Sequence, residues 1–198
     1  MLEKDFNQAF LVVSATARTT PDYPIRGYAG PSGRLDVIAR SILASMTCRE
    51  TLFIALLLGP PNPPKTLIYH SDKCTFKSER MVMMEIKRAY LSKSKCLEVE
   101  EWGIDEIVYN LVKSGFEIVM LREDGVDVSR ARRALIGRKV YVLGSHVDVP
   151  SDIERGVSRY VEYRVSIGPR SVYTSHAILY ILWARRVLSL GNAISTPR

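Results

Sequence analysis

The chain has 198 residues, 28 Lys and Arg against 21 Asp and Glu, and a net charge of +7. Hydrophobic residues make up 46% and charged residues 25%, which excludes a wholly disordered, collagen-like or coiled-coil chain. About 70% of the unfolded surface of a chain this long can be buried, so a single core is sufficient. The excess positive charge permits a polyanionic partner without identifying one.

Three cysteines, Cys48, Cys74 and Cys96, are an odd number at wide spacing, with no C-x-x-C or H-E-x-x-H motif. We therefore expect no zinc site and no disulfide framework, but three thiols in a reducing compartment. The longest apolar run, 52–58, is far shorter than the roughly 20 residues of a membrane span. The N-terminal residues show no signal peptide. These features predict a soluble, cytoplasmic protein without metal or membrane partners.

Short β-rich runs alternate with helical patterns along the chain. Strands are predicted at 10–14, 51–58, 66–69, 116–121, 140–143 and 161–167. Helices are predicted at 35–46, 79–90, 105–114, from 151 onward, and at 171–190. This order predicts an α/β fold with a mostly parallel sheet in one domain, 1–198, with a frayed tail at 191–198.

Turn and cap signals separate these elements. A turn is predicted at Glu123-Asp-Gly125, directly after a strand. Ser151 and Glu154 form a capping-box pattern that begins a helix just after Pro150. Ser32 or a residue beside it is a candidate cap for the first helix.

The segment Gly59-Pro-Pro-Asn-Pro-Pro-Lys-Thr66 is superficially similar to a phosphate-binding P-loop, but Pro64 replaces the second glycine. A P-loop holds phosphate with successive backbone N–H groups, and four prolines remove four of them. We therefore exclude NTP hydrolysis and interpret the segment as a rigid turn, after which Lys65 can still contact a phosphate. The G-x-G-x-x-G and G-x-S-x-G motifs are absent from the sequence.

Glycines close two predicted strands, in Leu143-Gly-Ser-His146 and Ile167-Gly-Pro-Arg-Ser171, and the end at 120–125 shares their edge. Ligands bind outside the carboxyl ends of strands in open α/β sheets, where glycine allows close approach. A ligand site and three ordinary βα turns are both consistent with this pattern. His146 and His176 follow the glycines; lone histidines are usually structural, and we expect neither to bind a metal.

Charged residues mark two further segments. Arg34 and Asp36 lie at the start of the first predicted helix, where an aspartate usually interacts with the helix dipole. A basic run, which is either a solvated face or a phosphate-binding stripe, comprises Arg130, Arg132, Arg133, Arg138 and Lys139.

Taken in order, a set of motifs resembles one known family. The motifs are Ala17-Arg-Thr-Thr-Pro21, Gly33-Arg-Leu-Asp-Val37, Leu57-Leu-Gly-Pro-Pro-Asn-Pro-Pro-Lys-Thr66, Glu123-Asp-Gly125, Leu143-Gly-Ser-His146 and Ser166-Ile-Gly-Pro-Arg-Ser171 followed by Ser175-His176. The family is TrmY, the archaeal tRNA pseudouridine-54 N1-methyltransferases of the SPOUT superfamily. The resemblance covers roughly residues 10–188.

The resemblance implies a SPOUT-type α/β fold with a mostly parallel sheet, helices on both faces and a C-terminal trefoil knot. It also implies a homodimer, S-adenosylmethionine as the methyl donor and the tRNA T-arm as the substrate. It places cofactor binding at Leu121, Gly144, Ile167, Gly168, Val172 and Ala177. Many members have Asp at the position of Ser145 and Cys at that of Ala177, so a thiol at 177 is not required here.

The family's Gly-Arg-Leu-Asp motif makes Asp36 the candidate that hydrogen-bonds or deprotonates the target base. Arg34 is then the candidate for a phosphate or base contact. We further expect RNA contacts at Arg18, Lys65, Arg132 and Arg133. The C-terminal helix, with Tyr180 and Trp183 on a broad apolar face, suits either a dimer interface or packing onto the sheet. Two alternatives stay open: an rRNA pseudouridine N1-methyltransferase of the Nep1 group, and a non-catalytic RNA-binding knot protein.

Overall fold

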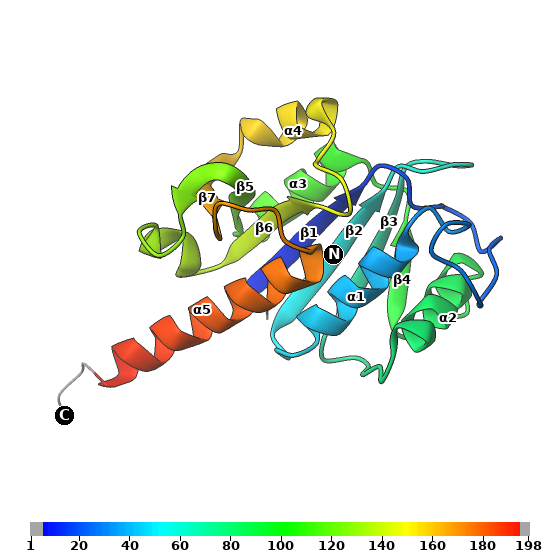
Figure 1. Ribbon diagram of the computed structural model, residues 1–198, viewed down its shortest axis with the longest axis horizontal. Coiled ribbons are helices and arrows are strands. Elements are labelled where there is room, and N and C mark those ends of the chain that lie inside the picture. The colour runs from blue at the N-terminus through cyan, green and yellow to red at the C-terminus, as the bar shows by residue number, and fades with distance from the viewer. Residues whose placement is uncertain (1–5, 195–198) are drawn as a thin grey trace.

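The structure, a computed structural model, describes residues 6–194 (Figure 1). Its side chains are described as far as residue 190. Its strands are β1 (Gln8–Ser14), β2 (Thr51–Leu57), β3 (Lys65–His70), β4 (Leu97–Glu100), β5 (Glu117–Asp127), β6 (Lys139–Gly144) and β7 (Val161–Ser166). Its helices are α1 (Leu35–Ser45), α2 (Glu79–Tyr90), α3 (Ile104–Lys113), the 3-10 turn η1 (Arg132–Leu135), α4 (Ser151–Ser158) and α5 (Thr174–Ile194).

The strands described within 6–194 form one sheet in the order β4-β3-β2-β1-β6-β5-β7. β1 runs parallel to β2 and β6, and β5 runs parallel to β6 and β7. Only β3 reverses direction, because it pairs antiparallel with β2 and β4. The predicted α/β fold with a mostly parallel sheet is therefore confirmed. The prediction of one domain over 1–198 extends beyond the described residues.

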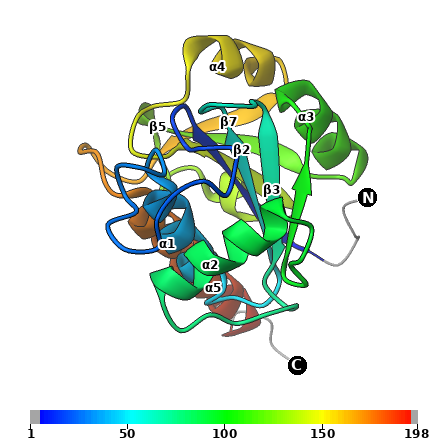
Figure 2. The same cartoon turned by 90° about the vertical axis from the view of Figure 1, so that its right-hand side faces the viewer.

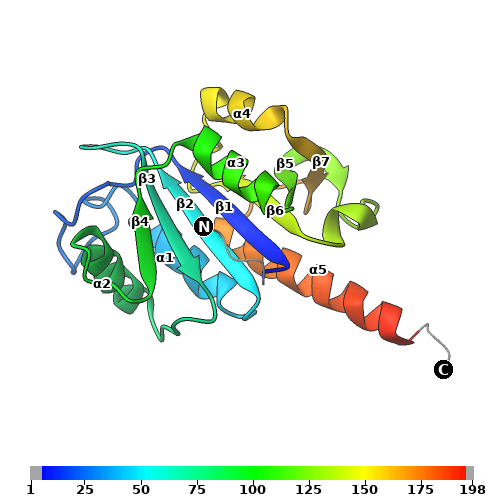
Figure 3. The ribbon, with the colours of Figure 1, turned by 180° about the vertical axis from the view of Figure 1, so that it is seen from behind.

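Helices cover both faces of this sheet, as the side view shows (Figure 2). The side chains of β1 are all buried but alternate between faces, as the period of a strand requires. Phe10 and Val12 pack with α1, α2 and α5, whereas Leu11 and Val13 pack with α3 and α4. The first group lies in front in Figure 1 and the second is seen from behind (Figure 3). The sheet is thus packed between two hydrophobic cores, one on each face.

Two strand predictions were incomplete. The four-residue strand β4 was not predicted, because its sequence Leu-Glu-Val-Glu is short and half polar. The turn predicted at Glu123-Asp-Gly125 is wrong, because β5 continues through it to Asp127. Leu121 and Val126 both pair with Val165 of β7, so the chain between them forms an irregularity inside the strand.

Helix boundaries also differ from the predictions. α4 does begin directly after Pro150, but Ser151 is its first helical residue and makes no capping hydrogen bond. Glu154 instead binds the guanidinium groups of Arg122 and Arg164. α5 begins at Thr174 rather than 171 and continues to 194, so the helix extends into the tail that was predicted to be frayed from 191. The rest of that tail, 195–198, lies outside the described residues.

Ser32 accepts a hydrogen bond from the first N–H of α1, on Leu35, at 3.2 Å. The N-cap residue is Arg34, which makes no side-chain capping hydrogen bond, so Ser32 satisfies this N–H from two residues before the N-cap position. None of the helices described between 6 and 194 is long and apolar enough to cross a membrane.

The expectation of three free thiols is wrong. Cys74 and Cys96 form a disulfide with their Cα atoms 5.6 Å apart, while Cys48 is a free thiol. Cys74 follows β3 and Cys96 precedes β4, so the antiparallel pairing of these strands brings the two cysteines together. A spacing of 22 residues carries no sign of this, because only the strand pairing puts both within disulfide range.

Candidate active site

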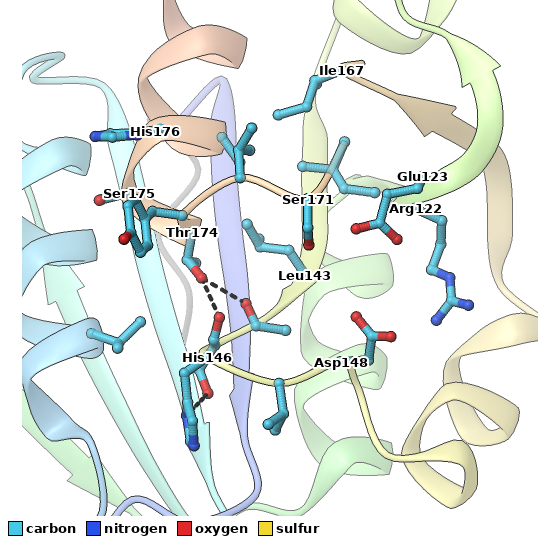
Figure 4. A pocket seen from close by; sticks show the side chains of 18 of the residues that line it. Arg122, Glu123, Leu143, His146, Asp148, Ile167, Ser171, Thr174, Ser175 and His176 are labelled. Carbon is cyan, nitrogen blue, oxygen red and sulfur yellow. Dashed lines mark hydrogen bonds between the residues drawn. The ribbon is translucent and has the colours of Figure 1, made fainter. Parts of the chain in front are cut away.

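A cavity of about 760 Å³ lies at the carboxyl ends of β5, β6 and β7. The segments that follow β6 and β7, the outer part of β5 and the start of α1 form its walls (Figure 4). Because these strands are parallel, their carboxyl ends meet at the same edge. This is the place where open α/β sheets bind ligands, and the volume falls within the range of roughly 300–1,000 Å³ found for small-molecule sites.

The six residues expected to bind the cofactor all line this cavity: Leu121, Gly144, Ile167, Gly168, Val172 and Ala177. They come from three segments that are up to 56 positions apart in the sequence, and the fold brings them together. Their side chains are small or apolar, so polar recognition at these positions falls to the backbone. Their arrangement suits a flat, partly apolar ligand.

The loop after β6 is fixed by its neighbours. The hydroxyl of Thr174, at the start of α5, donates to the carbonyl oxygens of Gly144 at 3.0 Å and Ser145 at 2.5 Å (Figure 4). The N–H of Ser145 donates to the carbonyl of Val13 in β1 at 3.0 Å. A Cβ on Gly144 would lie 2.2 Å from the carbonyl oxygen of Val147, so only glycine permits this tight turn.

Arg34 also lines the cavity, and Asp36 holds it in place. The Arg34 guanidinium donates to both carboxylate oxygens of Asp36, from Nε at 2.9 Å and Nη2 at 3.0 Å. Arg34 has a φ of 71°, in the left-handed region, which is uncommon outside glycine and often marks a functional position. Asp36 is 5% exposed and does not line the cavity itself.

A second arginine completes this ion-pair network. Arg40 donates to Asp36 Oδ2 at 2.5 Å, and its Nε lies 3.8 Å from Glu79 Oε2. The Tyr28 hydroxyl donates to Glu79 at 2.7 Å. The Arg40 contact was not predicted, although the spacing of four residues from Asp36 on a helix was a signal for it.

The ion pairs change the acidity of both members of the central pair. Burial alone would raise the pKa of Asp36, but the hydrogen bond from Arg34 and the charges of Arg34 and Arg40 outweigh it. The pKa of Asp36 is therefore held below its ordinary value of 3.8. The same hydrogen bond raises the pKa of Arg34. Asp36 is thus an ionised partner of two arginines and a weak proton acceptor.

Polar side chains approach the cavity from other sides. The carboxylates of Glu123 and Asp148 turn toward the same space (Figure 4). The ring of His146 lies beside Ser145, and His176 packs edge-on against Tyr173 at 5.4 Å between ring centroids. The cavity therefore offers two carboxylates, two imidazoles and the cationic rim formed by Arg34, Arg40, Arg122 and Arg170.

The residues expected to contact RNA lie outside the cavity. Lys65 forms an ion pair with Glu101 beside the proline-rich turn. Arg18 lies 3.7 Å from Asp22, in the loop between β1 and α1. Arg132 and Arg133 are exposed on η1, which leads into the amino end of β6, whereas the cavity is at its carboxyl end.

The basic run is not one continuous solvated stripe. Lys139 is 2% exposed, binds Glu117 and lies over the ring of Tyr163. Arg138 stacks on Phe116 at 4.5 Å. Two of its five members therefore stabilise the fold, which leaves Arg130, Arg132 and Arg133 exposed.

Among the described residues, no group of three or more His, Cys, Asp or Glu side chains is arranged to hold a metal ion. The expected absence of a metal stays a prediction.

Comparison with known proteins relates this chain to a family of enzymes. A family model for SAM-dependent RNA methyltransferases matches residues 7–186. The tRNA (pseudouridine(54)-N(1))-methyltransferase of Aeropyrum pernix is 38% identical over 178 residues, which cover 87% of this chain and 91% of the relative. The protein of the same name from Methanocella arvoryzae is 29% identical over 187 residues, covering 88% and 96%.

Solved structures share the fold at low sequence identity. Archaeoglobus fulgidus Nep1 bound to S-adenosylhomocysteine has a TM-score of 0.69 at 14% identity. The match covers 93% of this chain and 100% of the Nep1 chain. A small-subunit rRNA methyltransferase E from Neisseria gonorrhoeae, bound to S-adenosylmethionine, has a TM-score of 0.53 at 13% identity, covering 92% and 66%.

Proposed function

The chain belongs to the SAM-dependent RNA methyltransferases, and on this premise we propose that it methylates N1 of pseudouridine 54 in tRNA. The observation that carries the proposal is the cavity at the carboxyl ends of β5, β6 and β7, where the six expected cofactor residues meet. Relatives with this activity in their names match nearly the whole chain, the first at 38% identity. The family resemblance drawn from the ordered motifs is confirmed.

The residues of the cavity fit S-adenosylmethionine. Gly168 has a φ of 151°, and a Cβ there would meet nothing within 4 Å, so the backbone faces open space that a ligand can fill. Leu121, Ile167 and Val172 offer apolar contacts for an adenine ring. The carboxylates of Glu123 and Asp148 offer opposite charges to a cationic sulfonium and ammonium. When bound, this cofactor supplies an electrophilic methyl group.

The reaction requires a positioned nitrogen and a route for its proton. N1 of pseudouridine carries a hydrogen and is a poor nucleophile until that proton leaves. The protein must therefore align N1 with the methyl group and accept the proton. The walls of the cavity exclude water and align the substrate. Hydrogen bonds such as those of Thr174 hold these walls in place.

We assign the contact with the nucleobase or its phosphate to Arg34, which borders the cavity. Asp36 acts by orienting Arg34 and Arg40 through three hydrogen bonds between their side chains. Its lowered pKa and paired oxygens support this positioning role over the alternative in which it deprotonates the base.

RNA recognition draws on the excess positive charge. Arg18 lies in the loop after β1, and Lys65 begins the antiparallel strand β3 opposite the end of β2. Arg132 and Arg133 add exposed charge on η1. Shape and phosphate contacts dominate the recognition of structured RNA. The tRNA T-arm is the expected partner, and the cytoplasmic location expected from the sequence stays a prediction.

The C-terminal trefoil knot belongs to this proposal. The chain leaves the edge strand β7, crosses the ends of β5 and β6, and begins α5 at Thr174 against the loop after β6. Arg185 of α5 then donates to the carbonyl of Gly137, in the connection from β5 to β6. These crossings support a chain threaded through that connection.

The proposed function also includes a homodimer that forms through α5. Leu179, Tyr180, Trp183 and Val187 are between 37% and 61% exposed along one face of this helix. Ile178 and Ile181 on the opposite face are buried, so the sheet does not take up Trp183. An exposed apolar face of this length favours a protein interface. Light scattering should give twice the monomer mass at micromolar concentration, and a monomer for Trp183→Asp.

Two experiments test the proposed function. Isothermal titration with S-adenosylhomocysteine should show binding; absence of heat would favour the non-catalytic alternative. Modification mapping should then find N1-methylpseudouridine at position 54 of tRNA. A product in small-subunit rRNA would favour the alternative target, for which the likeness to Nep1 at 14% identity shows only a shared fold.

A further inference from the structure

His146 and Ser145 form a hydrogen-bonded pair at the wall of the cavity. The Ser145 hydroxyl lies 3.2 Å from Nδ1 of His146 (Figure 4). On the other side of the ring, Nε2 lies 3.5 Å from the hydroxyl of Thr16, in the loop after β1. Both Ser145 and His146 line the cavity.

The partners of Thr16 determine where the proton of the neutral ring lies. Thr16 donates its only hydroxyl hydrogen to the carbonyl of Gly33 at 2.8 Å. Its oxygen can therefore only accept from His146, which places the ring proton on Nε2. Nδ1 then carries the free lone pair, and the Ser145 hydroxyl donates to it. A proton acceptor that faces Ser145 needs an unprotonated Nδ1, and this tautomer provides it.

The same contacts anchor the Ser145–His146 pair to the loop that carries Arg34, the residue expected to contact the substrate. Gly33, which Thr16 holds, directly precedes Arg34. The backbone of Ser145 is itself fixed from β1 and α5. The imidazole and the guanidinium of Arg34 are thus anchored to a common loop, and both border the cavity.

We propose that Ser145 and His146 form the proton relay that deprotonates N1 of pseudouridine during methyl transfer, an inference that rests on the proposed function. As the bond from N1 to the methyl carbon forms, the bond from that carbon to the sulfonium sulfur breaks and leaves its electron pair on sulfur. The N1–H bond breaks as well, and its proton passes to Ser145 Oγ. The Ser145 hydroxyl proton passes to Nδ1 of His146. The positive charge lost from the sulfonium thus ends on an imidazolium, which releases its proton to solvent because His146 is exposed.

Asp36 and His176 are less suited to this task. Asp36 is buried, lies outside the cavity lining and is held by two arginines. His176 packs against Tyr173. The charged groups that share the cavity with His146 are Arg34 and Arg40 from α1, Arg122 and Glu123 from β5, Asp148 from its own loop, and Arg170 and His176 from the segment around the start of α5.

Kinetics test the relay. His146→Ala and Ser145→Ala should each lower kcat by about 100-fold, the lower end of the effect of general base catalysis. Because both act on one proton, the double variant should be no slower than the slower single variant. Ser145→Thr keeps the hydroxyl and should stay within about fivefold of wild type, and imidazole in solution should partly rescue His146→Ala. Ser158→Ala, a serine of α4 that bonds only within its helix, is the matched control.

NMR of the free protein tests the hydrogen-bond logic without turnover. The imidazole nitrogens of His146 should show an unprotonated Nδ1 and a protonated Nε2 in the neutral ring. Ser145→Ala should shift the Nδ1 resonance, and Ser158→Ala should not. A neutral ring protonated at Nδ1, a kcat within threefold of wild type for either alanine variant, or a double variant equal to the product of the single effects would overturn the relay.

The controls separate this proposal from the function on which it rests. If wild type binds S-adenosylhomocysteine but methylates no pseudouridine, the proposed function fails. If wild type is active and the alanine variants bind S-adenosylhomocysteine with unchanged affinity and turn over normally, only the relay fails.

Discussion

Arg34 and Asp36 form a two-pronged ion pair, with Nε 2.9 Å from Oδ1 and Nη2 3.0 Å from Oδ2. Only the arginine borders the cavity, while the carboxylate is buried behind it and also binds Arg40. Parallel hydrogen bonds of this kind fix the plane of a guanidinium as well as its position. The aspartate therefore determines where the positive charge of the site points.

Replacement of this aspartate should reduce catalysis and stability together. Asp36→Asn removes the charge that holds two arginines, and we expect a loss of about 2 kcal/mol in unfolding free energy. Methylation should slow because Arg34 is no longer held. A methylation rate near wild type, with tRNA binding intact, would contradict any role of Asp36 in the reaction.

Asp36 should also make the free energy of unfolding depend on pH in the acid range. Folding lowers the pKa of Asp36, so the native state binds fewer protons than the unfolded chain between the two pKa values. Its contribution is fully present above the ordinary value of 3.8 and is lost as pH falls through the lowered native value. Urea unfolding of wild type and Asp36→Asn should therefore converge in stability at low pH. Asp152→Asn, an exposed carboxylate of α4, is the control and should follow wild type.

The disulfide should contribute measurably to stability. Cys74 and Cys96 close a loop of 22 residues, for which chain entropy predicts about 3 kcal/mol. Calorimetry of Cys74→Ser with Cys96→Ser should show Tm lower by about 6–12 °C for a protein of this size. Cys48→Ser is the matched control and should leave Tm dependent on reductant. A Tm that neither the double variant nor reductant changes would contradict a disulfide in solution.

Gly144→Ala should disturb cofactor binding more than folding. A Cβ at this position would lie 2.2 Å from the Val147 carbonyl oxygen and must displace the loop that forms one cavity wall. We expect the Kd for S-adenosylhomocysteine, measured by isothermal titration, to rise at least about tenfold. Gly30→Ala has open space around its Cβ and should bind as wild type does. Equal affinities for the two variants would place the cofactor elsewhere.

Binding to tRNA should weaken steeply with salt. Phosphate contacts release counterions, so log Kd should rise linearly with log salt concentration. Arg132→Ala with Arg133→Ala should reduce that slope by about 0.7 for each lost contact. Lys113→Ala, on α3, is the control and should leave the slope unchanged. A flat salt dependence in wild type would argue against RNA contacts by the basic surface.

The sequence was most informative where the apolar residues formed one clear pattern, either a continuous run or a helical spacing. β1 and β2 are continuous apolar runs, and helix α2 was predicted with its observed boundaries because its apolar positions recur at helical spacing. β4 and the continuation of β5 beyond Leu121 could not be predicted, because a polar edge strand and an irregular register depend on a partner strand. The Cys74–Cys96 disulfide depends on pairing in the same way.

For the candidate site, glycines at strand ends indicated one edge of the sheet but were consistent with both a ligand site and ordinary turns. The family resemblance supplied the six expected cofactor residues, and all six line the cavity at that edge. What sequence could not show was which side chains meet across it. The contact between Thr16 and His146 joins residues 130 positions apart. The ion pair of Glu79 with Arg40 likewise joins two different helices. No local pattern encodes either contact.

The most direct test of the account is methyl transfer from S-adenosylmethionine to two tRNA transcripts that differ only at position 54, with the nucleosides identified by mass spectrometry. The pseudouridine transcript should gain one methyl group at N1. The uridine transcript should gain none, because N1 of uridine is bonded to the ribose and has no proton to lose. Methylation of the uridine transcript at position 54, or none of the pseudouridine transcript by an enzyme that binds S-adenosylhomocysteine, would contradict the account.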